Sequence, residues 1–142
     1  MRNIISKIKK SESVILDFDG VILNTSNLKN QIFIDLYETK YKVKIKKFIL
    51  NNPGLNRFEI ISYIEKNILK NSSSENIKDK VNAFANKSLE LSKKLKLTEA
   101  LFEFLKTLKV HNVKLFINSA ADKNEILYLL NHNKISIFFL DI

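Results

Sequence analysis

The stretch Val14-Ile15-Leu16-Asp17-Phe18-Asp19-Gly20-Val21-Ile22 decides how the fold begins and marks the first candidate site. Residues 14–16 predict a short buried strand, because the apolar run is continuous and β-branched at two of its three positions. Side chains two residues apart on a strand point to the same side, so Asp17 and Asp19 are expected to face together. Gly20 then allows a sharp turn or the close approach of a ligand.

Two carboxylates placed in this way repel each other at neutral pH unless a cation or a shared proton relieves them. The pair therefore indicates a hard divalent metal site, a proton-transfer pair, or both. A solvated loop after a strand also explains the pattern, because turn geometry favours aspartate. A calcium loop is excluded. Counted from Asp17 it requires glycine at the sixth position and glutamate at the twelfth, where the chain has Ile22 and Leu28.

The composition allows one medium domain, or a core with an inserted subdomain. The 142 residues are 45% hydrophobic, and the two Gly and one Pro favour helices over tight turns. The net charge is +9, but the lysines are spread along the chain, which indicates a compositional bias rather than a patch for a polyanion. The densest basic stretch, residues 40–47, suits the wet face of a helix or of a short extended segment.

Several functional classes follow or are excluded. A non-catalytic basic protein that binds nucleic acid is an alternative of another class, although no aromatic stacking platform interleaves the lysines. The absence of cysteine excludes disulfides, thiolate metal sites and a thiol nucleophile. No signal-peptide pattern opens the chain and no apolar run approaches the length of a membrane span, so we expect a cytoplasmic protein with no membrane partner.

Residues 25–95 predict an all-helical block. Apolar side chains recur every three or four residues over 25–41 and again over 77–95. Between them, Asn52-Pro53-Gly54 is a strong turn signal. Asn56, with a glutamate three residues later, predicts a capping box at the start of a further helix.

The pattern changes after residue 95. A helix beginning at Thr98, a strand over residues 113–117, a helix beginning at Asp122 and a last apolar run over residues 135–140 follow in turn. Strands that alternate with helices predict a parallel sheet with right-handed crossovers. The predicted fold is therefore α/β, with about three strands and an inserted helical block.

Polar residues follow the first two predicted strands. Asp17 and Asp19 come at the end of the first strand, and Asn118 and Ser119 at the end of the second. Ligands of open parallel sheets bind beyond the carboxyl ends of the strands, so Ser119 faces the carboxylate pair if the strands are neighbours. The free N–H groups of the helix that Asp122 begins would suit an anion there. Alone, Ser119 is more typical of the approach to a helix.

With these residues in view, the chain resembles the haloacid dehalogenase (HAD) superfamily of phosphohydrolases. Its first strand and Asp17-Phe18-Asp19-Gly20-Val21 through Thr25 resemble the first motif of that family. Leu115-Phe116-Ile117-Asn118-Ser119 resembles the second motif. The helical block, residues 25–95, is similar in position to the small cap of the phosphoglycolate phosphatase and β-phosphoglucomutase branch. Residues 1–24 and 96–142 would then form a Rossmann-like core.

The resemblance implies a Mg²⁺-dependent phosphatase that acts on a small phosphorylated metabolite. Asp17 would attack the phosphoryl group to form an aspartyl-phosphate. Asp19 would protonate the leaving oxygen and then deprotonate the attacking water. Asp17 would contribute its side chain to the Mg²⁺ site and Asp19 its backbone carbonyl. Ser119, with Asn118 and Gly20, would bind the phosphoryl group.

The helical block adds a second implication of the resemblance. Gly54-Leu55-Asn56-Arg57 resembles the substrate-specificity loop of the family's cap. Arg57 would bind the distal anionic group of the substrate, because its planar fork suits phosphate or carboxylate. A surface arginine after a turn is the plainer interpretation. The same loop also leaves open a phosphosugar mutase that uses the same aspartyl-phosphate.

The chain departs from the family after its last apolar run. The family needs a third-motif lysine and a fourth-motif acidic cluster there, and Asp141 is not placed to replace the cluster. We therefore expect the front part of a larger enzyme, or a truncated and impaired relative. Residues 14–18 would form an unpaired sheet edge. The chain alone is then expected to be marginally stable, to self-associate and to have little phosphatase activity, with the helical block surviving better.

Overall fold

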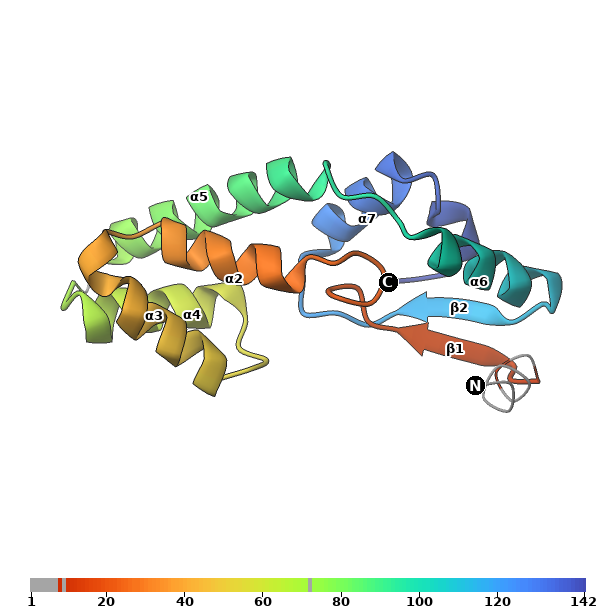
Figure 1. The fold of residues 1–142 in the computed structure, drawn as a ribbon, viewed down its shortest axis with the longest axis horizontal. Coiled ribbons are helices and arrows are strands. Elements are labelled where there is room, and N and C mark those ends of the chain that lie inside the picture. Colours follow the sequence, from red (N-terminus) through yellow and green to blue (C-terminus); the bar gives the residue numbers. More distant parts are fainter. Residues whose placement is uncertain (1–7, 9, 72) are drawn as a thin grey trace. The chain divides into compact units, whose positions relative to one another are not determined.

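A computed structural model describes residue 8, residues 10–71 and residues 73–142. They form two compact units (Figure 1). The sheet unit comprises the described part of Met1–Asn24 together with Lys93–Ile142, and the helical unit comprises Thr25–Ser92. The elements are, in order, β1 (Ser13–Leu16), α2 (Ser26–Asp35), α3 (Thr39–Asn51), α4 (Arg57–Tyr63), the π-helix η1 (Ile64–Ile68), α5 (Ser74–Ser92), α6 (Glu99–Val110), β2 (Lys114–Ile117), α7 (Lys123–His132) and the 3₁₀-helix η2 (Ser136–Phe138).

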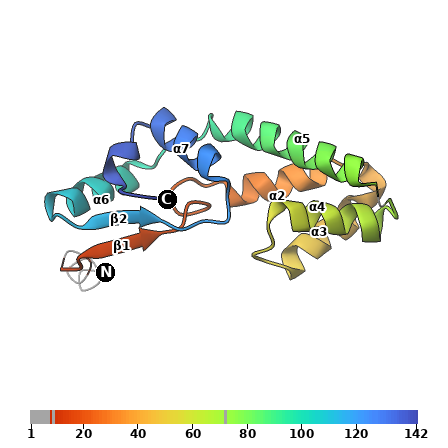
Figure 2. The ribbon, with the colours of Figure 1, turned by 180° about the vertical axis from the view of Figure 1, so that it is seen from behind.

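The sheet unit is built on the parallel pair β1 and β2, which lie side by side in Figures 1 and 2. The register runs from Ser13 opposite Lys114 to Leu16 opposite Ile117. The helices α6 and α7 supply buried leucine and isoleucine side chains to this unit, and Leu115 and Ile117 are buried on β2. The predicted parallel arrangement of the first two strands is confirmed.

The last apolar run, residues 135–140, was expected to be a third strand, and this is wrong for most of its length. Its centre is the 3₁₀-helix η2, which is held by local hydrogen bonds such as the one from the Phe138 N–H to the Ile135 carbonyl (3.1 Å). Pairing with β2 begins only at its end, where the Leu140 N–H donates to the Leu115 carbonyl (2.8 Å). Phe116 and Asp141 form a single parallel bridge there.

The bridge between Phe116 and Asp141 lies on the side of β2 opposite to β1. Within the described part of the chain, β1 therefore pairs with β2 alone and forms an edge of the sheet, as expected for residues 14–18. Ile15 is 66% exposed on this strand. Its backbone groups and its apolar side chain are available to another strand.

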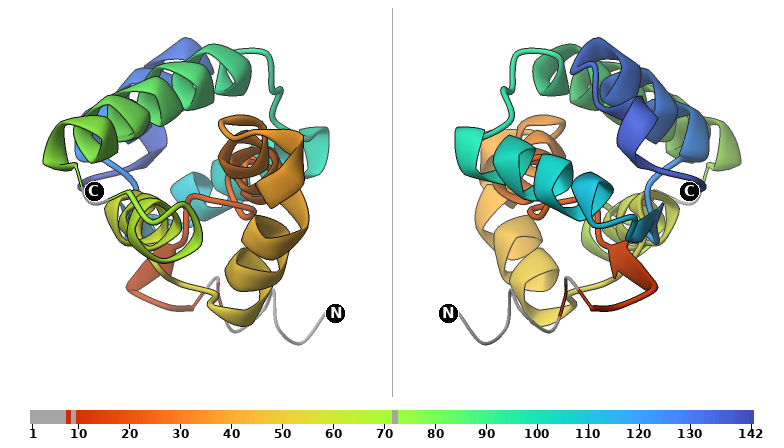
Figure 3. Two further views of the ribbon diagram at one scale, coloured as in Figure 1. Left: turned by 90° about the vertical axis from the view of Figure 1, so that its left-hand side faces the viewer. Right: turned by 90° about the vertical axis from the view of Figure 1, so that its right-hand side faces the viewer.

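The helical unit packs four α-helices and η1 around one core (Figures 2 and 3). The stacked rings of Phe33 and Phe84, with centroids 4.1 Å apart, join α2 to α5. The helical spacing over residues 25–41 does not correspond to one continuous helix, because α2 ends at Asp35 and α3 begins at Thr39. Glu38 has an extended backbone (φ −60°, ψ 151°), which interrupts the helix. Residues 40–47 lie in α3, so the helical alternative for the basic stretch is confirmed.

Local capping signals were predicted well. The Asn56 side chain accepts a hydrogen bond from the Glu59 N–H (3.0 Å), and the Glu59 carboxylate accepts one from the Asn56 N–H (2.7 Å), which completes the capping box. Thr98 caps α6 by accepting from the Leu101 N–H (3.2 Å). No helix among the described residues is long and apolar enough to cross a membrane.

Candidate active site

The candidate site lies where β1 and β2 end together. Leu16 is opposite Ile117, and the next N–H along, that of Asn118, donates to the Leu16 carbonyl (3.0 Å). Asp17 and Asn118 therefore follow the carboxyl ends of neighbouring parallel strands. This is the edge at which ligands of parallel sheets bind.

The two aspartates of the first motif flank a buried ring. Phe18 is buried, whereas Asp17 is exposed and Asp19 is half-buried. The exposure thus alternates from Asp17 to Asp19, and the orientation of the two carboxylates toward one side stays a prediction. The Asp17 Oδ1 accepts a hydrogen bond from the N–H of Phe18 (2.7 Å), which fixes the orientation of this carboxylate.

A tight backbone loop follows the pair. The Phe18 carbonyl accepts from the N–H groups of Ile22 (3.0 Å) and Leu23 (3.2 Å), and the Gly20 N–H donates to the Leu23 carbonyl (2.7 Å). Gly20 has φ +82°, in the left-handed region that glycine adopts without strain. The loop therefore needs a glycine here and holds Asp19 close to the end of β1.

The second motif ends in a turn that leads to α7. Ser119 is half-buried, and its Oγ accepts a hydrogen bond from the Ala121 N–H (3.2 Å). The Asp122 carboxylate accepts from the N–H groups of Asn124 (2.9 Å) and Glu125 (3.2 Å). The expectation that the free N–H groups of this helix would face an anion is not met for these two groups, because Asp122 itself satisfies them. For the same reason Asp122 is engaged as a cap.

Lys123, which the sequence did not single out, pairs with Asp141 at the single bridge between Phe116 and Asp141. The Lys123 Nζ pairs with the Asp141 Oδ1 at 3.1 Å. A hydrogen bond from the Ile142 N–H and then Lys123 hold the pKa of Asp141 below its usual range. No spacing rule links these residues, because their contact depends on how the segment after η2 joins β2.

Arg57 belongs to the helical unit, where it is the first residue of α4. It follows the turn at Gly54, whose φ of +93° explains the glycine. The guanidinium of Arg57 lies 5.6 Å from the ring centroid of Phe84, a favourable cation–π distance. Its side chain is half-buried in this position.

The residues offer part of a magnesium shell. No group of three or more His, Cys, Asp or Glu side chains converges on a metal position within residues 10–71 and 73–142. Mg²⁺ is commonly held by only one or two carboxylates together with water and substrate phosphate. Asp17 and Asp19 carry the carboxyl and carbonyl oxygens at this edge of the sheet that would supply ligands to such a site.

Residues 14–142 match the sequence model of the haloacid dehalogenase-like hydrolases. The chain belongs to this family. Its predicted fold class is confirmed as an incomplete Rossmann-like parallel core with an inserted helical unit. This HAD-like chain has no match among proteins with curated descriptions.

Solved structures share the fold of this HAD-like chain. A candidate β-phosphoglucomutase from Thermotoga maritima is 22% identical with a TM-score of 0.62, over 92% of this chain and 59% of that one. A HAD hydrolase of family IA from Entamoeba histolytica is 18% identical with a TM-score of 0.66, over 90% and 57%. The candidate hydrolase YfnB from Bacillus subtilis, solved with magnesium bound, is 17% identical with a TM-score of 0.61, over 94% and 65%. The chain thus spans about three fifths of the length of these relatives.

Proposed function

We propose that this chain carries the nucleophile and the acid–base group of a Mg²⁺-dependent phosphatase that acts on a small phosphorylated metabolite. The observation that carries the proposal is the register of β1 and β2, which ends at Leu16 opposite Ile117. This register brings Asp17 next to Asn118 at the carboxyl edge of the sheet. Membership of the HAD-like hydrolases supports the reaction class.

Asp17 would be the nucleophile. Its Oδ1 is held by the Phe18 N–H, which leaves the second oxygen to attack phosphorus. Attack forms an acyl phosphate on Asp17, and the bond from phosphorus to the leaving oxygen breaks. Asp19, two residues further on, would give its proton to that leaving oxygen. It would then take a proton from the water that hydrolyses the acyl phosphate, which returns both carboxylates to their starting forms.

The remaining residues would hold the phosphoryl group in place. Ser119 accepts one hydrogen bond through its Oγ and keeps its own O–H to donate to a phosphoryl oxygen. Asn118 would donate from its side-chain amide, and Gly20 would allow the substrate close to the backbone. The Asp17 carboxylate and the Asp19 backbone carbonyl would hold Mg²⁺, which when bound would neutralise charge on the phosphoryl oxygens.

The helical unit would act as the cap of this site and choose the substrate. Arg57 would turn from the Phe84 ring toward the distal anionic group of the substrate, because a guanidinium pairs with carboxylate or phosphate through two parallel hydrogen bonds. The cap role of Thr25–Ser92 is part of the proposal.

A phosphosugar mutase is the second candidate. It is suggested by the Gly54–Arg57 loop, which resembles the substrate-specificity loop of the family's cap. Gly54 shapes this loop through its positive φ, because no atom lies within 4 Å of an added Cβ. The shared fold with a candidate β-phosphoglucomutase adds support. Isomerisation of a sugar phosphate without net release of phosphate would favour this function over hydrolysis.

The test is phosphate release from a broad panel of small phosphorylated metabolites. The protein assayed should carry these 142 residues with any continuation that its gene encodes. We expect release that requires Mg²⁺ and that Asp17→Asn lowers by at least about 10³-fold. Asp35→Asn, an exposed aspartate on α2, is the matched control and should retain activity. Activity that survives Asp17→Asn, or no release from any substrate, would exclude this hydrolysis mechanism.

A further inference from the structure

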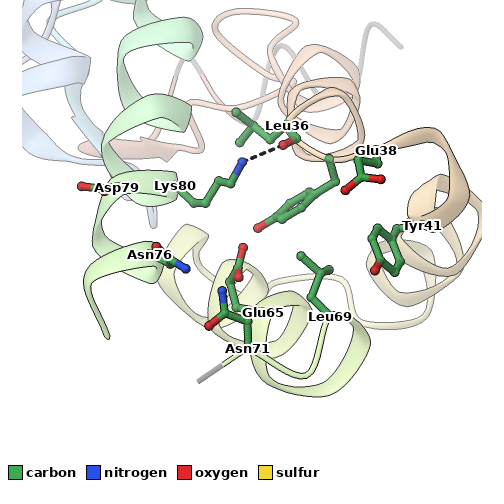
Figure 4. A pocket seen from close by; sticks show the side chains of 10 residues that line it. Leu36, Glu38, Tyr41, Glu65, Leu69, Asn71, Asn76, Asp79 and Lys80 are labelled. Carbon is green, nitrogen blue, oxygen red and sulfur yellow. Dashed lines mark hydrogen bonds between the residues drawn. The ribbon is translucent and has the colours of Figure 1, made fainter. Parts of the chain in front are cut away.

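The helical unit contains a cavity that the proposed phosphatase site does not use. It has a volume of about 380 Å³ and lies among the end of α2, η1 and the start of α5 (Figure 4). This is the size of sites for small metabolites. We call it the Glu65 cavity, after the most buried charged residue that lines it.

Two buried polar groups in the Glu65 cavity lack partners. Glu65 is 2% exposed and Tyr37 is 7% exposed. The Glu65 Oε1 and the Tyr37 hydroxyl have no hydrogen-bond partner among the residues that the structure describes. Leaving such groups unpaired away from water is costly, so a ligand that pairs with them would be stabilised.

The π-helix η1 explains how a glutamate comes to lie inside. Its wider turn is seen in the bond from the Leu69 N–H to the Ile64 carbonyl, five residues back (2.9 Å). Ile64 and Glu65 are consecutive and both buried. Single π-turns of this kind occur frequently at functional sites.

Tyr37 is the second partner that the cavity offers. Burial, and then the negative charge of Glu65, raise the pKa of the Tyr37 hydroxyl well above its ordinary value. The hydroxyl therefore stays protonated at neutral pH. An interaction of the Tyr37 hydroxyl with the Glu65 carboxylate contributes to this raised pKa, yet no hydrogen bond of good geometry joins the two groups. Even if they turned toward each other, a carboxylate accepts several hydrogen bonds and would retain capacity for a ligand.

The Lys80 ammonium, which also lines the cavity, already donates a hydrogen bond to the backbone. The Lys80 Nζ donates to the Leu36 carbonyl at the end of α2 (3.0 Å), as Figure 4 shows, and lies 5.1 Å from the Tyr37 ring centroid. It therefore completes the helix end rather than neutralising Glu65. Glu65 remains available to a cation that enters from outside.

The charge of the lining is opposite to that of the chain. Three of the lining residues are acidic, Glu38, Glu65 and Asp79, although the whole protein carries +9; Figure 4 shows the Asp79 carboxylate pointing away from the cavity. Glu38 is exposed at the rim and pairs with Lys40 (2.9 Å), and Asp79 is also exposed. Glu65 is therefore the carboxylate that the cavity itself offers to a cation. A metal ion is not indicated, because no metal-binding group of three is found within the described residues.

The cavity is also distant from the chain connections to the sheet unit. From Lys80 in its lining to Ser92 at the end of α5 is twelve helical residues, which span about 18 Å. Every residue that lines the Glu65 cavity belongs to the helical unit, so the cavity shares no residue with the proposed phosphatase site in the sheet unit.

We propose that the Glu65 cavity binds a small organic ammonium compound, with its ammonium on the Glu65 carboxylate and on the oxygen of Tyr37. The side-chain amide of Asn76, drawn in Figure 4, would bind a further polar group of the same ligand. This site is additional to the proposed catalytic function and does not depend on it.

The test is a titration of the isotope-labelled full chain with 1,4-diaminobutane and with ethanolamine, followed by NMR. We expect saturable shifts at the amides of residues 37, 65 and 76 and no change at those of Asp17 and Ser119. The uncharged 1,4-butanediol should cause none of these shifts. No saturable shift with either amine, or equal shifts with the diol, would overturn the proposal.

Variants separate binding at Glu65 from a general effect of charge. Glu65→Gln should weaken amine binding at least tenfold, and Tyr37→Phe should weaken it less. The control Glu103→Gln removes the same charge from exposed α6, where Glu103 pairs with Lys106, and should leave binding unchanged. Equal losses in the Glu65 and Glu103 variants would overturn the proposal. Shifts at the same amides on diluting the protein alone would assign the ammonium to a lysine of a second copy, which would also overturn it.

Discussion

The helical unit and the sheet unit differ in how far apart along the chain the residues are that hold each unit together internally. In the helical unit, consecutive elements from α2 to α5 share one apolar core. In the sheet unit, β1 pairs with β2 from about a hundred residues further along. Local contacts form at a small cost in loop entropy, whereas the pairing of β1 with β2 must close a long loop first.

The candidate catalytic residues depend on the long-range pairing of the sheet unit. Asp17 and Asn118 meet only because β1 and β2 pair in one register. A slip of one residue would turn every side chain of β1 to the other face of the sheet. The unit with the more demanding contacts therefore carries the candidate catalytic residues, while the locally built unit carries Arg57.

The largest expected effect is on catalysis, where a substitution in the sheet unit should change kcat and one in the helical unit should change KM. Asp19→Asn should lower kcat by roughly 10²–10⁴-fold, because it removes the proposed acid–base group. Arg57→Ala should mainly raise KM, by about 10- to 100-fold, because it removes the charged hydrogen bond that we propose Arg57 makes to the substrate. Steady-state kinetics on the most active substrate of the panel measures both. An Asp19→Asn variant with unchanged kcat would contradict the proposed division of roles.

Next in size are two cavity-forming substitutions, one in each unit. Phe84→Ala in the helical unit should cost roughly 3–5 kcal/mol, and Leu115→Ala on β2 roughly 2–5 kcal/mol, because both side chains are fully buried. Hydrogen exchange read by mass spectrometry should show faster exchange over α2 to α5 in the first variant and over β1 and β2 in the second. Faster exchange in both units from either variant would show that they unfold together.

The free edge of β1 allows a smaller and more specific test. Ile15→Lys should reduce self-association of the 142-residue chain, because a charged side chain opposes pairing at an exposed edge. Its stability should change by no more than about 0.5 kcal/mol, since the side chain is mostly exposed. Sedimentation velocity at several concentrations gives the distribution of species. Val43→Lys, at an exposed position on α3, is the control. An identical decrease in that variant would argue against the β1 edge.

The smallest expected effect is a pH dependence in the helical unit. Hydrogen bonds from Gln31 (3.0 Å) and Lys42 (3.1 Å) lower the pKa of Asp35 below its ordinary value of 3.8. A lowered pKa in the folded state stabilises above pH 3.8, and this stabilisation is lost as the pH falls through the folded value. Because Asp35 is exposed, the effect should be small. Urea unfolding of Asp35→Asn and wild type should differ at pH 6 and converge in strong acid; a constant difference would contradict this.

The parts of the fold that follow from short-range chemistry could be predicted from the sequence. Asn56 with Glu59, and Thr98 before α6, act through bonds to residues three positions away, so their spacing is sufficient. The neighbourhood of Asp17 and Asn118 followed from the order of strands and helices. The break between α2 and α3 did not, because the apolar spacing continues through Tyr37 while the backbone of Glu38 is extended.

The parts that the sequence did not predict depend on unusual turns or distant contacts. The apolar residues Ile61, Ile64 and Ile68 recur at helical spacing, and this pattern gives no reason to expect Glu65 to be buried. The π-turn of η1 changed that phase. The pair of Lys123 and Asp141 required the short bridge after η2, where the apolar run that suggested a strand coils into a 3₁₀-turn instead.

Covalent capture of a phosphoryl group on Asp17 tests the central claim most directly. The protein, with any continuation that its gene encodes, is mixed with Mg²⁺ and a small phosphoryl donor such as acetyl phosphate, quenched in acid and mapped by mass spectrometry. We predict an acyl phosphate on Asp17 that is absent in Asp17→Asn. It should accumulate in Asp19→Asn, because hydrolysis of the intermediate is slowed. A phosphoryl group on another residue, or none in either the wild type or the Asp19 variant, would contradict the account.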